Sequence, residues 1–289
     1  MPPDEELDRF GHPVRLELAQ GAGSGSSDLR TSGRAILGGG AHRWPAIVHE
    51  AHGSDMPLQE EVEALRRARR PRMVLEPDPG RARRVALVPG SFDPITVAHA
   101  ALADAVGPWA DIVVMVYSVR TVPKESGAEP PLLSEDERLR ALQMFSRSRP
   151  NTVLGVCSHG LLVEQVRAAR DRFPEAELRM VIGSDKVIQL LDPSWYADRD
   201  VSLDGLFRES RVVFGARGGE LQAVQALLAA RPNLPWRDRF ERVDLPPGVA
   251  PVSSREVRSK RRRGEDVRHL VPASVLALIA GVGAGPAGE

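Results

Sequence analysis

From Arg83 onward the chain alternates short apolar runs with longer amphipathic stretches, and this alternation limits the possible folds more than any other feature of the sequence. Apolar runs of this kind predict strands buried on both faces of a parallel sheet. The predicted strands are 85–89, 112–117, 153–157, 180–183, 212–215 and 242–245, and the predicted helices between them are 98–106, 134–146, 161–173 and 221–230. We therefore expect an α/β fold with a doubly wound parallel sheet, which binds ligands at the carboxyl ends of its strands.

Residues 1–80 differ in composition from the rest of the chain, with Gly and Ser concentrated in 21–27 and Pro and Arg in 67–79. We expect an N-terminal extension of unknown role over 1–80. One helix is predicted within it, at 58–69, where apolar residues recur at helical spacing. The α/β domain is predicted to span 81–282, where a last helix ends at Gly281, and 283–289 to form a flexible tail.

The charge balance and the single cysteine exclude several classes of protein. Lys plus Arg and Asp plus Glu number 39 each, so we expect neither a nucleic-acid partner nor a membrane partner. Cys157 cannot form an internal disulfide, and the apolar runs are far shorter than the roughly 20 residues that span a bilayer. Without a signal-peptide pattern, we expect a cytoplasmic protein. The oligomeric state stays open, a homo-oligomer included. His42, His49 and His52 are expected to be solvent-exposed rather than metal ligands.

The segment 90–99, Gly-Ser-Phe-Asp-Pro-Ile-Thr-Val-Ala-His, directly follows the first predicted strand and runs into a predicted helix. Gly90 allows the backbone to approach a ligand closely, and the N–H groups at a helix start attract anions, so this turn suits phosphate. Thr96 and His99 lie one helical turn apart and can face the same ligand. In the alternative interpretation, Asp93 caps the helix and His99 is an ordinary surface histidine.

A second segment, 252–258, reads Val-Ser-Ser-Arg-Glu-Val-Arg. Ser253 and Glu256 match a capping box, which places Ser254 at the start of a helix and Arg258 one turn inside it on the same face. The segment is therefore a second candidate anion site. Its alternative interpretation is an ordinary helix cap followed by a solvated basic helix at 258–263.

Together, the two segments resemble the motifs of the nucleotidylyltransferase superfamily. Segment 90–99 is similar to the T/HxGH signature, with Thr96 and His99 at its first and last positions and Ala98 in place of the usual glycine. Segment 252–258 is similar to the ISSTxxR motif, and 264–272 to the ending of pyridine mononucleotide adenylyltransferases. The resemblance covers about 83–279 and implies a Rossmann-like nucleotidyltransferase domain behind an N-terminal extension.

The same resemblance implies roles for individual residues. Thr96, His99 and Arg258 would be catalytic. The implied acceptor-binding residues are Lys124 and Trp195. The implied ATP-binding residues are Gly90, Ser91, Phe92, Asp93, His99, Gly183, Asp185, Arg217, Ser253, Ser254 and Arg258. As alternatives, Asp185 caps a helix, Trp195 belongs to the core, and Lys124 and Arg217 are surface charges.

The implied reaction transfers AMP from ATP to nicotinate or nicotinamide mononucleotide and releases pyrophosphate, in NAD synthesis. Mg²⁺ would bridge oxygens of the leaving group, with no metal ligand from the protein. One departure concerns the acceptor: bacterial enzymes of this kind carry a Ser-Tyr-Thr-x-x-Thr run where residues 158–164 read Ser-His-Gly-Leu-Leu-Val-Glu. Transfer to another small phosphate ester, such as phosphopantetheine, and a non-catalytic nucleotide-binding protein of the same fold remain as alternatives.

Overall fold

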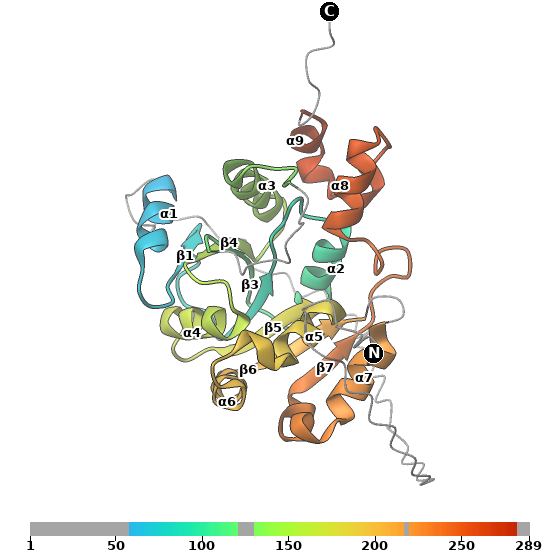
Figure 1. Ribbon diagram of the computed structural model, residues 1–289. Coiled ribbons are helices and arrows are strands. Elements are labelled where there is room, and N and C mark those ends of the chain that lie inside the picture. The colour runs from blue at the N-terminus through green and yellow to red at the C-terminus, as the bar shows by residue number, and fades with distance from the viewer. Residues whose placement is uncertain (1–57, 121–129, 217–219, 282–289) are drawn as a thin grey trace, which may run out of the picture. The chain divides into compact units, whose positions relative to one another are not determined.

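The structure is a computed structural model that describes residues 58–120, 130–216 and 220–281 of the 289. Its centre is a seven-stranded sheet with the strand order β1-β4-β3-β2-β5-β6-β7 (Figure 1). The strands are β1 (Met73–Glu76), β2 (Arg84–Pro89), β3 (Ile112–Ser118), β4 (Thr152–Cys157), β5 (Glu177–Gly183), β6 (Ser210–Gly215) and β7 (Phe240–Val243). All neighbours pair in parallel except β1, which is antiparallel to β4.

This strand order confirms the predicted doubly wound sheet. The chain adds β3 and β4 on one side of β2, then crosses over and adds β5, β6 and β7 on the other side. The winding direction therefore reverses between β2 and β5. At such a switch point the connections leave the carboxyl ends of the two strands in opposite directions and open a crevice, where ligands of doubly wound proteins bind.

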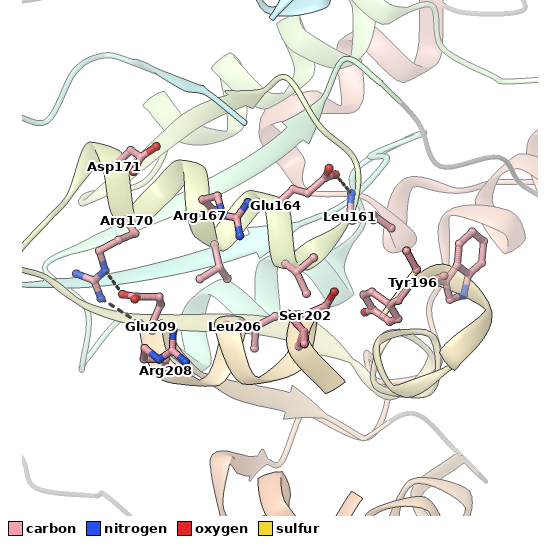
Figure 2. A pocket seen from close by; sticks show the side chains of 16 residues that line it. Leu161, Glu164, Arg167, Arg170, Asp171, Tyr196, Ser202, Leu206, Arg208 and Glu209 are labelled. Carbon is pink, nitrogen blue, oxygen red and sulfur yellow. Dashed lines mark hydrogen bonds and ion pairs between the residues drawn. The ribbon is translucent and has the colours of Figure 1, made fainter. Parts of the chain in front are cut away.

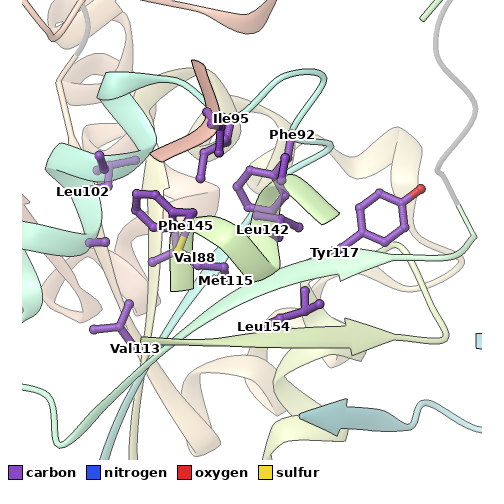
Figure 3. Packing of buried hydrophobic residues seen from close by; sticks show 14 of the residues in the cluster. Val88, Phe92, Ile95, Leu102, Val113, Met115, Tyr117, Leu142, Phe145 and Leu154 are labelled. Carbon is purple, nitrogen blue, oxygen red and sulfur yellow. The ribbon is translucent and has the colours of Figure 1, made fainter. Parts of the chain in front are cut away.

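Helices cover both faces of the sheet and enclose two hydrophobic cores. The α-helices are α1 (Leu58–Arg67), α2 (Val97–Val106), α3 (Glu135–Arg147), α4 (Leu162–Arg172), α5 (Ser184–Leu191), α6 (Arg199–Glu209), α7 (Glu220–Ala229), α8 (Ser254–Arg262) and α9 (Leu276–Gly281). Helices α1, α2, α3, α8 and α9 contribute to one core, part of which Figure 3 shows. Helices α4 to α7 contribute to the other.

Strand β2 shows how the sequence fixes these layers. Its apolar residues alternate between the two cores, with Ala86 and Val88 in one and Val85 and Leu87 in the other. A continuous apolar run is therefore required, because both faces of the strand are covered. The predicted capping box of α3 is also present: the Glu137 amide donates to Ser134 Oγ at 3.3 Å, and the Ser134 amide donates to Glu137 Oε2 at 2.8 Å.

Part of the segment expected to be an extension belongs to this fold. Helix α1 buries Val62 and Leu65 in the first core, and β1 pairs with β4 along its whole length. The folded unit thus includes residues before position 81, the predicted start of the domain. Residues 1–57 and the predicted tail lie outside the described residues.

Three further details differ from the sequence-based expectations. Helices α5 and α6 were not predicted; α6 carries Gly205 in its middle and lacks a clear apolar stripe. Strand β7 begins at Phe240 rather than at 242. The last predicted helix is a short 3₁₀ turn, Ala273–Val275, followed by α9. Within the part of the chain that the structure describes, no helix is long and apolar enough to cross a membrane.

Candidate functional site

The switch point brings two predicted segments to the same edge of the sheet. Gly90 follows β2 and Gly183 ends β5, and each lies three residues past the last registered pair of these strands, Leu87 and Met180. The turn after β2 leads into α2, and α5 begins directly after Gly183. Two helix N-termini therefore start at this edge, where their N–H groups favour an anion.

The turn after β2 is tightly packed around Phe92. The Gly90 amide donates to the Val116 carbonyl at 3.1 Å, and a Cβ atom on Gly90 would lie 2.8 Å from the ring of Phe92. Phe92 itself is fully buried and has a φ of 45°, a conformation that costs free energy for a residue other than glycine. Glycine at position 90 is therefore required so that the Phe92 ring can pack beneath the turn.

Thr96 and His99 are in direct contact, but Thr96 is fully buried, so its hydroxyl faces His99 rather than a ligand. Thr96 is the N-cap of α2, its amide donates to His99 Nδ1 at 3.1 Å, and its Oγ1 lies 2.8 Å from the same nitrogen. Because Nδ1 accepts a hydrogen bond from the amide, the neutral imidazole carries its proton on Nε2. The half-buried ring also packs against Phe92, with centroids 5.1 Å apart. His99 is thus a fixed N–H donor at the first turn of α2.

Helix α8 is anchored to the same turn. Ser253 is its N-cap and accepts from the Glu256 amide at 3.1 Å, which is one of the two hydrogen bonds of the predicted capping box. Ser254 Oγ donates to the Pro94 carbonyl at 2.8 Å, and Arg258 Nη1 donates to the Asp93 carbonyl at 2.8 Å. The two motifs, 160 or more residues apart in sequence, therefore meet through direct hydrogen bonds.

The Asp93 side chain is buried where the two motifs meet and is not exposed to a ligand. Its buried carboxylate accepts from the amides of Leu132 and Leu133 at 2.8–3.2 Å. Arg138 and Arg258 lie 3.7 and 3.5 Å from its Oδ2. Asp93 does not cap α2, because Thr96 does. The carboxylate instead connects the turn to the start of α3 and to α8.

The charges of this cluster do not balance. Arg138 and Arg258 are 12% and 13% exposed and share one carboxylate, which leaves a positive charge in excess. In addition, Arg258 Nε is buried and has no hydrogen-bond partner among the described residues. An excess cation away from water requires an anion. Together with the α2 and α8 N-termini, the cluster is suited to bind phosphate groups.

Ala98 occupies the position at which the T/HxGH signature has glycine. It is fully buried and lies within the core on this face of the sheet. Its methyl group therefore packs into the interior, which explains how alanine is accommodated at this position.

On the β5 side of the switch point, the predicted residues lie at the start of α5. Gly183 is the N-cap, and Ser184, which is fully buried, donates from Oγ to Glu220 Oε2 at 2.6 Å. Asp185 follows in the first turn and is exposed. A carboxylate exposed beside the crevice can accept hydrogen bonds from ligand hydroxyl groups. Glu220, which holds Ser184, was not predicted.

A cavity of about 570 Å³ lies between α4 and α6 (Figure 2). Leu161 lines it together with Trp195, the last residue of the 3₁₀ turn η1 (Pro193–Trp195), and with Tyr196. Trp195 is half-buried and lines this cavity, so it is not part of the core. Tyr196 anchors the turn: its hydroxyl donates to the Leu190 carbonyl at 2.8 Å, and burial raises its pKa to about 12.

The structure therefore brings most of the predicted site residues together, and it adds residues that were not predicted. Arg138 was missed, because an arginine in the second turn of an amphipathic helix carries no signal that separates it from solvated charge. Lys124 and Arg217 lie outside the described residues, as do His42, His49 and His52. Among the described residues, no group of three or more His, Cys, Asp or Glu side chains is arranged to hold a metal ion.

Comparison with known proteins agrees with this geometry. The model of a family described as cytidylyltransferase-like matches residues 87–259, which include both motifs. Among curated proteins, a "Probable nicotinate-nucleotide adenylyltransferase" from Salinibacter ruber is 29% identical over 209 residues, covering 68% of this chain and 94% of the relative. A protein with the same name from a Nocardioides species is 28% identical over 195 residues, covering 66% and 88%.

Among solved structures, this chain is similar to Plasmodium falciparum nicotinic acid mononucleotide adenylyltransferase complexed with APC. The TM-score is 0.48 and the sequence identity 14%, with 68% of this chain and 94% of the other covered.

Proposed function

The chain belongs to the cytidylyltransferase-like family and is a nucleotidyltransferase, and from this premise we propose that it transfers AMP from ATP to a pyridine mononucleotide and releases pyrophosphate, in NAD synthesis. The observation that carries this proposal is the joint cradle of α2 and α8. There Arg258 and Ser254 bind the backbone of the turn that holds Thr96 and His99. The names of the relatives support the pyridine mononucleotide as acceptor.

In the proposed mechanism, the triphosphate of ATP lies at the N-termini of α2 and α8, with its ribose towards Gly183 and Asp185. A phosphate oxygen of the acceptor attacks the α-phosphorus in line, a new P–O bond forms, and the bond to pyrophosphate breaks. The electron pair leaves with pyrophosphate, so no covalent enzyme intermediate is needed. Catalysis then consists of positioning and of stabilising the charge that develops on the phosphoryl oxygens.

Each side chain of the cradle has a proposed task. His99 donates from Nε2–H to a phosphoryl oxygen, and Thr96 fixes the orientation of its ring. Arg258 contributes the excess positive charge of the cluster. Ser253 and Ser254 set the start of α8, whose amides face the leaving group.

Mg²⁺ enters this proposal as a companion of ATP. Around the cradle the side chains offer hydroxyl groups, an imidazole and guanidinium groups. The carboxylate of Asp93 already accepts three backbone hydrogen bonds. These residues suit phosphate rather than a bare divalent ion. The ion would be held by phosphate oxygens and water, which is common for Mg²⁺ bound with nucleotides.

The acceptor is proposed to lie between the turn after β4 and η1, with its ring against Trp195. Trp195 is half-buried and lines the cavity, so one side of its indole can be covered by a flat ring. Comparing nicotinate with nicotinamide mononucleotide as acceptor distinguishes a ring carboxylate from a ring amide.

The test is pyrophosphate release by the purified chain with ATP, Mg²⁺ and, separately, nicotinate mononucleotide, nicotinamide mononucleotide and phosphopantetheine. Release with one of the two pyridine mononucleotides supports the proposal and identifies the acceptor. Release with phosphopantetheine alone assigns the chain to a different branch of the family. ATP binding without release in any reaction would identify a non-catalytic nucleotide-binding protein. Replacing ATP with CTP tests the choice of nucleotide.

A further inference from the structure

The segment before position 81 reaches the ligand-binding edge of the sheet. In the antiparallel pair of β1 and β4, Met73 lies opposite Cys157. The residue before β1 therefore lies beside the residue after β4. The Ser158 amide donates to the Arg72 carbonyl at 2.9 Å, and the Arg72 amide donates to Ser158 Oγ at 2.8 Å. The end of α1 and its connection to β1 are thus next to the turn from β4 to α4.

Arg120 connects this segment to that turn. Its Nη2 donates to the carbonyls of Arg66 and Ala68 at 2.6 and 2.7 Å, and its Nη1 lies 3.2 Å from His159 Nε2. These two carbonyls belong to the C-terminal end of α1, where backbone oxygens have no partner within the helix. One planar guanidinium therefore binds the end of α1 and the imidazole of His159 together.

The hydrogen bonds continue from His159 into the backbone of the turn. Its Nδ1 lies 2.8 Å from Ser158 Oγ, and its carbonyl accepts from Ser118 Oγ at 2.9 Å. Since Arg120 donates to Nε2, the imidazole proton lies on Nδ1 and is donated to Ser158. This assignment agrees with the other contacts of Ser158 Oγ, which accepts from the Arg72 amide and donates to the Arg70 carbonyl at 3.4 Å. The chain of hydrogen bonds runs from α1 through Arg120 and His159 to Ser158, in the turn before α4.

The position of this turn affects the acceptor side of the site. The turn continues through Gly160 to Leu161, which lines the cavity together with Trp195. A movement of the turn would therefore change the gap between Leu161 and Trp195. We propose that Arg120 is a positioning residue that sets this gap for the ring of the acceptor. This inference rests on the proposed function, because it assumes that the acceptor ring binds at Trp195.

A purely structural role would predict something different. Arg172 also links the segment before position 81 to α4, through an ion pair with Asp78. However, Arg172 is the last residue of α4, about 15 Å along the helix from its first turn. If both arginines only fasten the segment to the domain, replacing either one has the same consequence. If Arg120 positions the turn, only its replacement affects the acceptor.

The experiment compares the full-length chain with Arg120→Ala, Arg120→Lys and Arg172→Ala. Steady-state kinetics use whichever pyridine mononucleotide the unaltered chain accepts. For Arg120→Ala we expect the acceptor KM to rise about tenfold, with kcat and the ATP KM changed by less than about twofold. Arg120→Lys retains the charge but cannot bind two carbonyls and an imidazole in one plane, so we expect an intermediate KM. Arg172→Ala is expected to keep the acceptor KM of the unaltered chain.

Hydrogen–deuterium exchange provides a readout that does not depend on turnover. In Arg120→Ala the amides of 158–161 are expected to exchange faster, whereas Arg172→Ala leaves them unchanged. Equal acceptor KM values in the two alanine variants, or unchanged exchange in Arg120→Ala, would overturn this inference and leave the proposed function intact. A chain that releases no pyrophosphate with any acceptor would overturn the proposed function, and the role of Arg120 toward an acceptor with it.

Discussion

The proposed ATP side and the proposed acceptor side of the site are built differently. On the ATP side, backbone carbonyls of the turn after β2 accept hydrogen bonds from Ser254 and Arg258, and the buried cluster around Asp93 connects three elements. On the acceptor side, a half-buried Trp195 lines an open cavity, opposite a turn that is held from outside by Arg120. The first side is fixed by direct hydrogen bonds between two motifs and by a buried carboxylate, and the second by a chain of hydrogen bonds that lies outside the cavity.

This difference suggests how such a site divides its tasks. A phosphate chain is the same in every nucleotide, so backbone amides, helix N-termini and guanidinium groups in one fixed arrangement can bind it. An acceptor differs from enzyme to enzyme, and side chains from loops can change without loss of the fold. The ATP side is therefore expected to govern turnover, and the acceptor side affinity.

The strongest test of this division is His99→Ala. If Nε2–H stabilises charge that develops during transfer, kcat falls by at least about a hundredfold, as expected when a preorganised donor is removed. Pyrophosphate release at saturating ATP and acceptor measures the change. The matched control is His269→Ala, an exposed histidine of the 3₁₀ turn Arg268–Leu270, which should keep full turnover. A folded His99→Ala protein with normal kcat would show that the imidazole has no part in the chemistry.

The next effect in size is expected for Arg258→Ala. The variant removes the excess positive charge beside Asp93 and one hydrogen bond to the turn. We expect kcat/KM for ATP to fall by about ten- to a hundredfold, the range for a charged hydrogen bond in a buried site. Arg255→Ala removes an exposed cation from the same helix and is the control. If both variants lose ATP use equally, the general charge of α8 matters rather than the cradle.

A smaller effect, confined to the acceptor, is expected for Trp195→Ala. Loss of the indole face should raise the acceptor KM about tenfold with little change in kcat, because stacking on an aromatic ring contributes around 1 kcal/mol or slightly more. Trp195→Phe should recover much of the affinity. An unchanged acceptor KM in Trp195→Ala rules out the stacking role and moves the acceptor elsewhere along the sheet edge.

The smallest effect concerns Asp111, at the amino ends of β2 and β3 and far from both sides of the site. Its carboxylate accepts from the Arg83 and Arg84 amides at 3.0 Å and from the Arg84 side chain at 3.1 Å. Burial alone would raise the pKa of Asp111, but these hydrogen bonds outweigh it and hold the pKa below its ordinary value.

A group with a lowered pKa in the folded state stabilises the protein above its unfolded pKa, and this contribution is lost as the pH falls through the folded value. Asp111→Asn should therefore lower the free energy of unfolding by about 1 kcal/mol at pH 7, and by less below about pH 4. Urea denaturation at both pH values measures the difference. Activity of the folded variant should match that of the unaltered chain, and a reduced kcat would show that the two ends of the sheet are coupled.

The separation of contacting residues along the chain explains what the sequence could predict. The strands follow from apolar runs, and the starts of α2 and α8 follow from glycine and capping residues. These are local signals. The role of Asp93 depends on amides about 40 residues away and on Arg258, 165 residues away. For this reason its local sequence predicted a ligand contact, whereas its carboxylate connects the turn to α3 and α8. The edge strand β1 was missed, because four residues beside a Pro- and Arg-rich stretch give no period that separates them from a loop.

That edge strand also has a consequence for synthesis of the chain. Met73 pairs with Cys157, which the ribosome adds 84 residues later. At about 5–20 residues per second, roughly 4–17 seconds pass between the synthesis of β1 and that of its partner strand. The contact between Arg120 and His159 can therefore form only after β4 has been added, but before the contact between Asp93 and Arg258. Codons translated slowly between these two strands would prolong the interval in which α1 and β1 are exposed to chaperones and proteases.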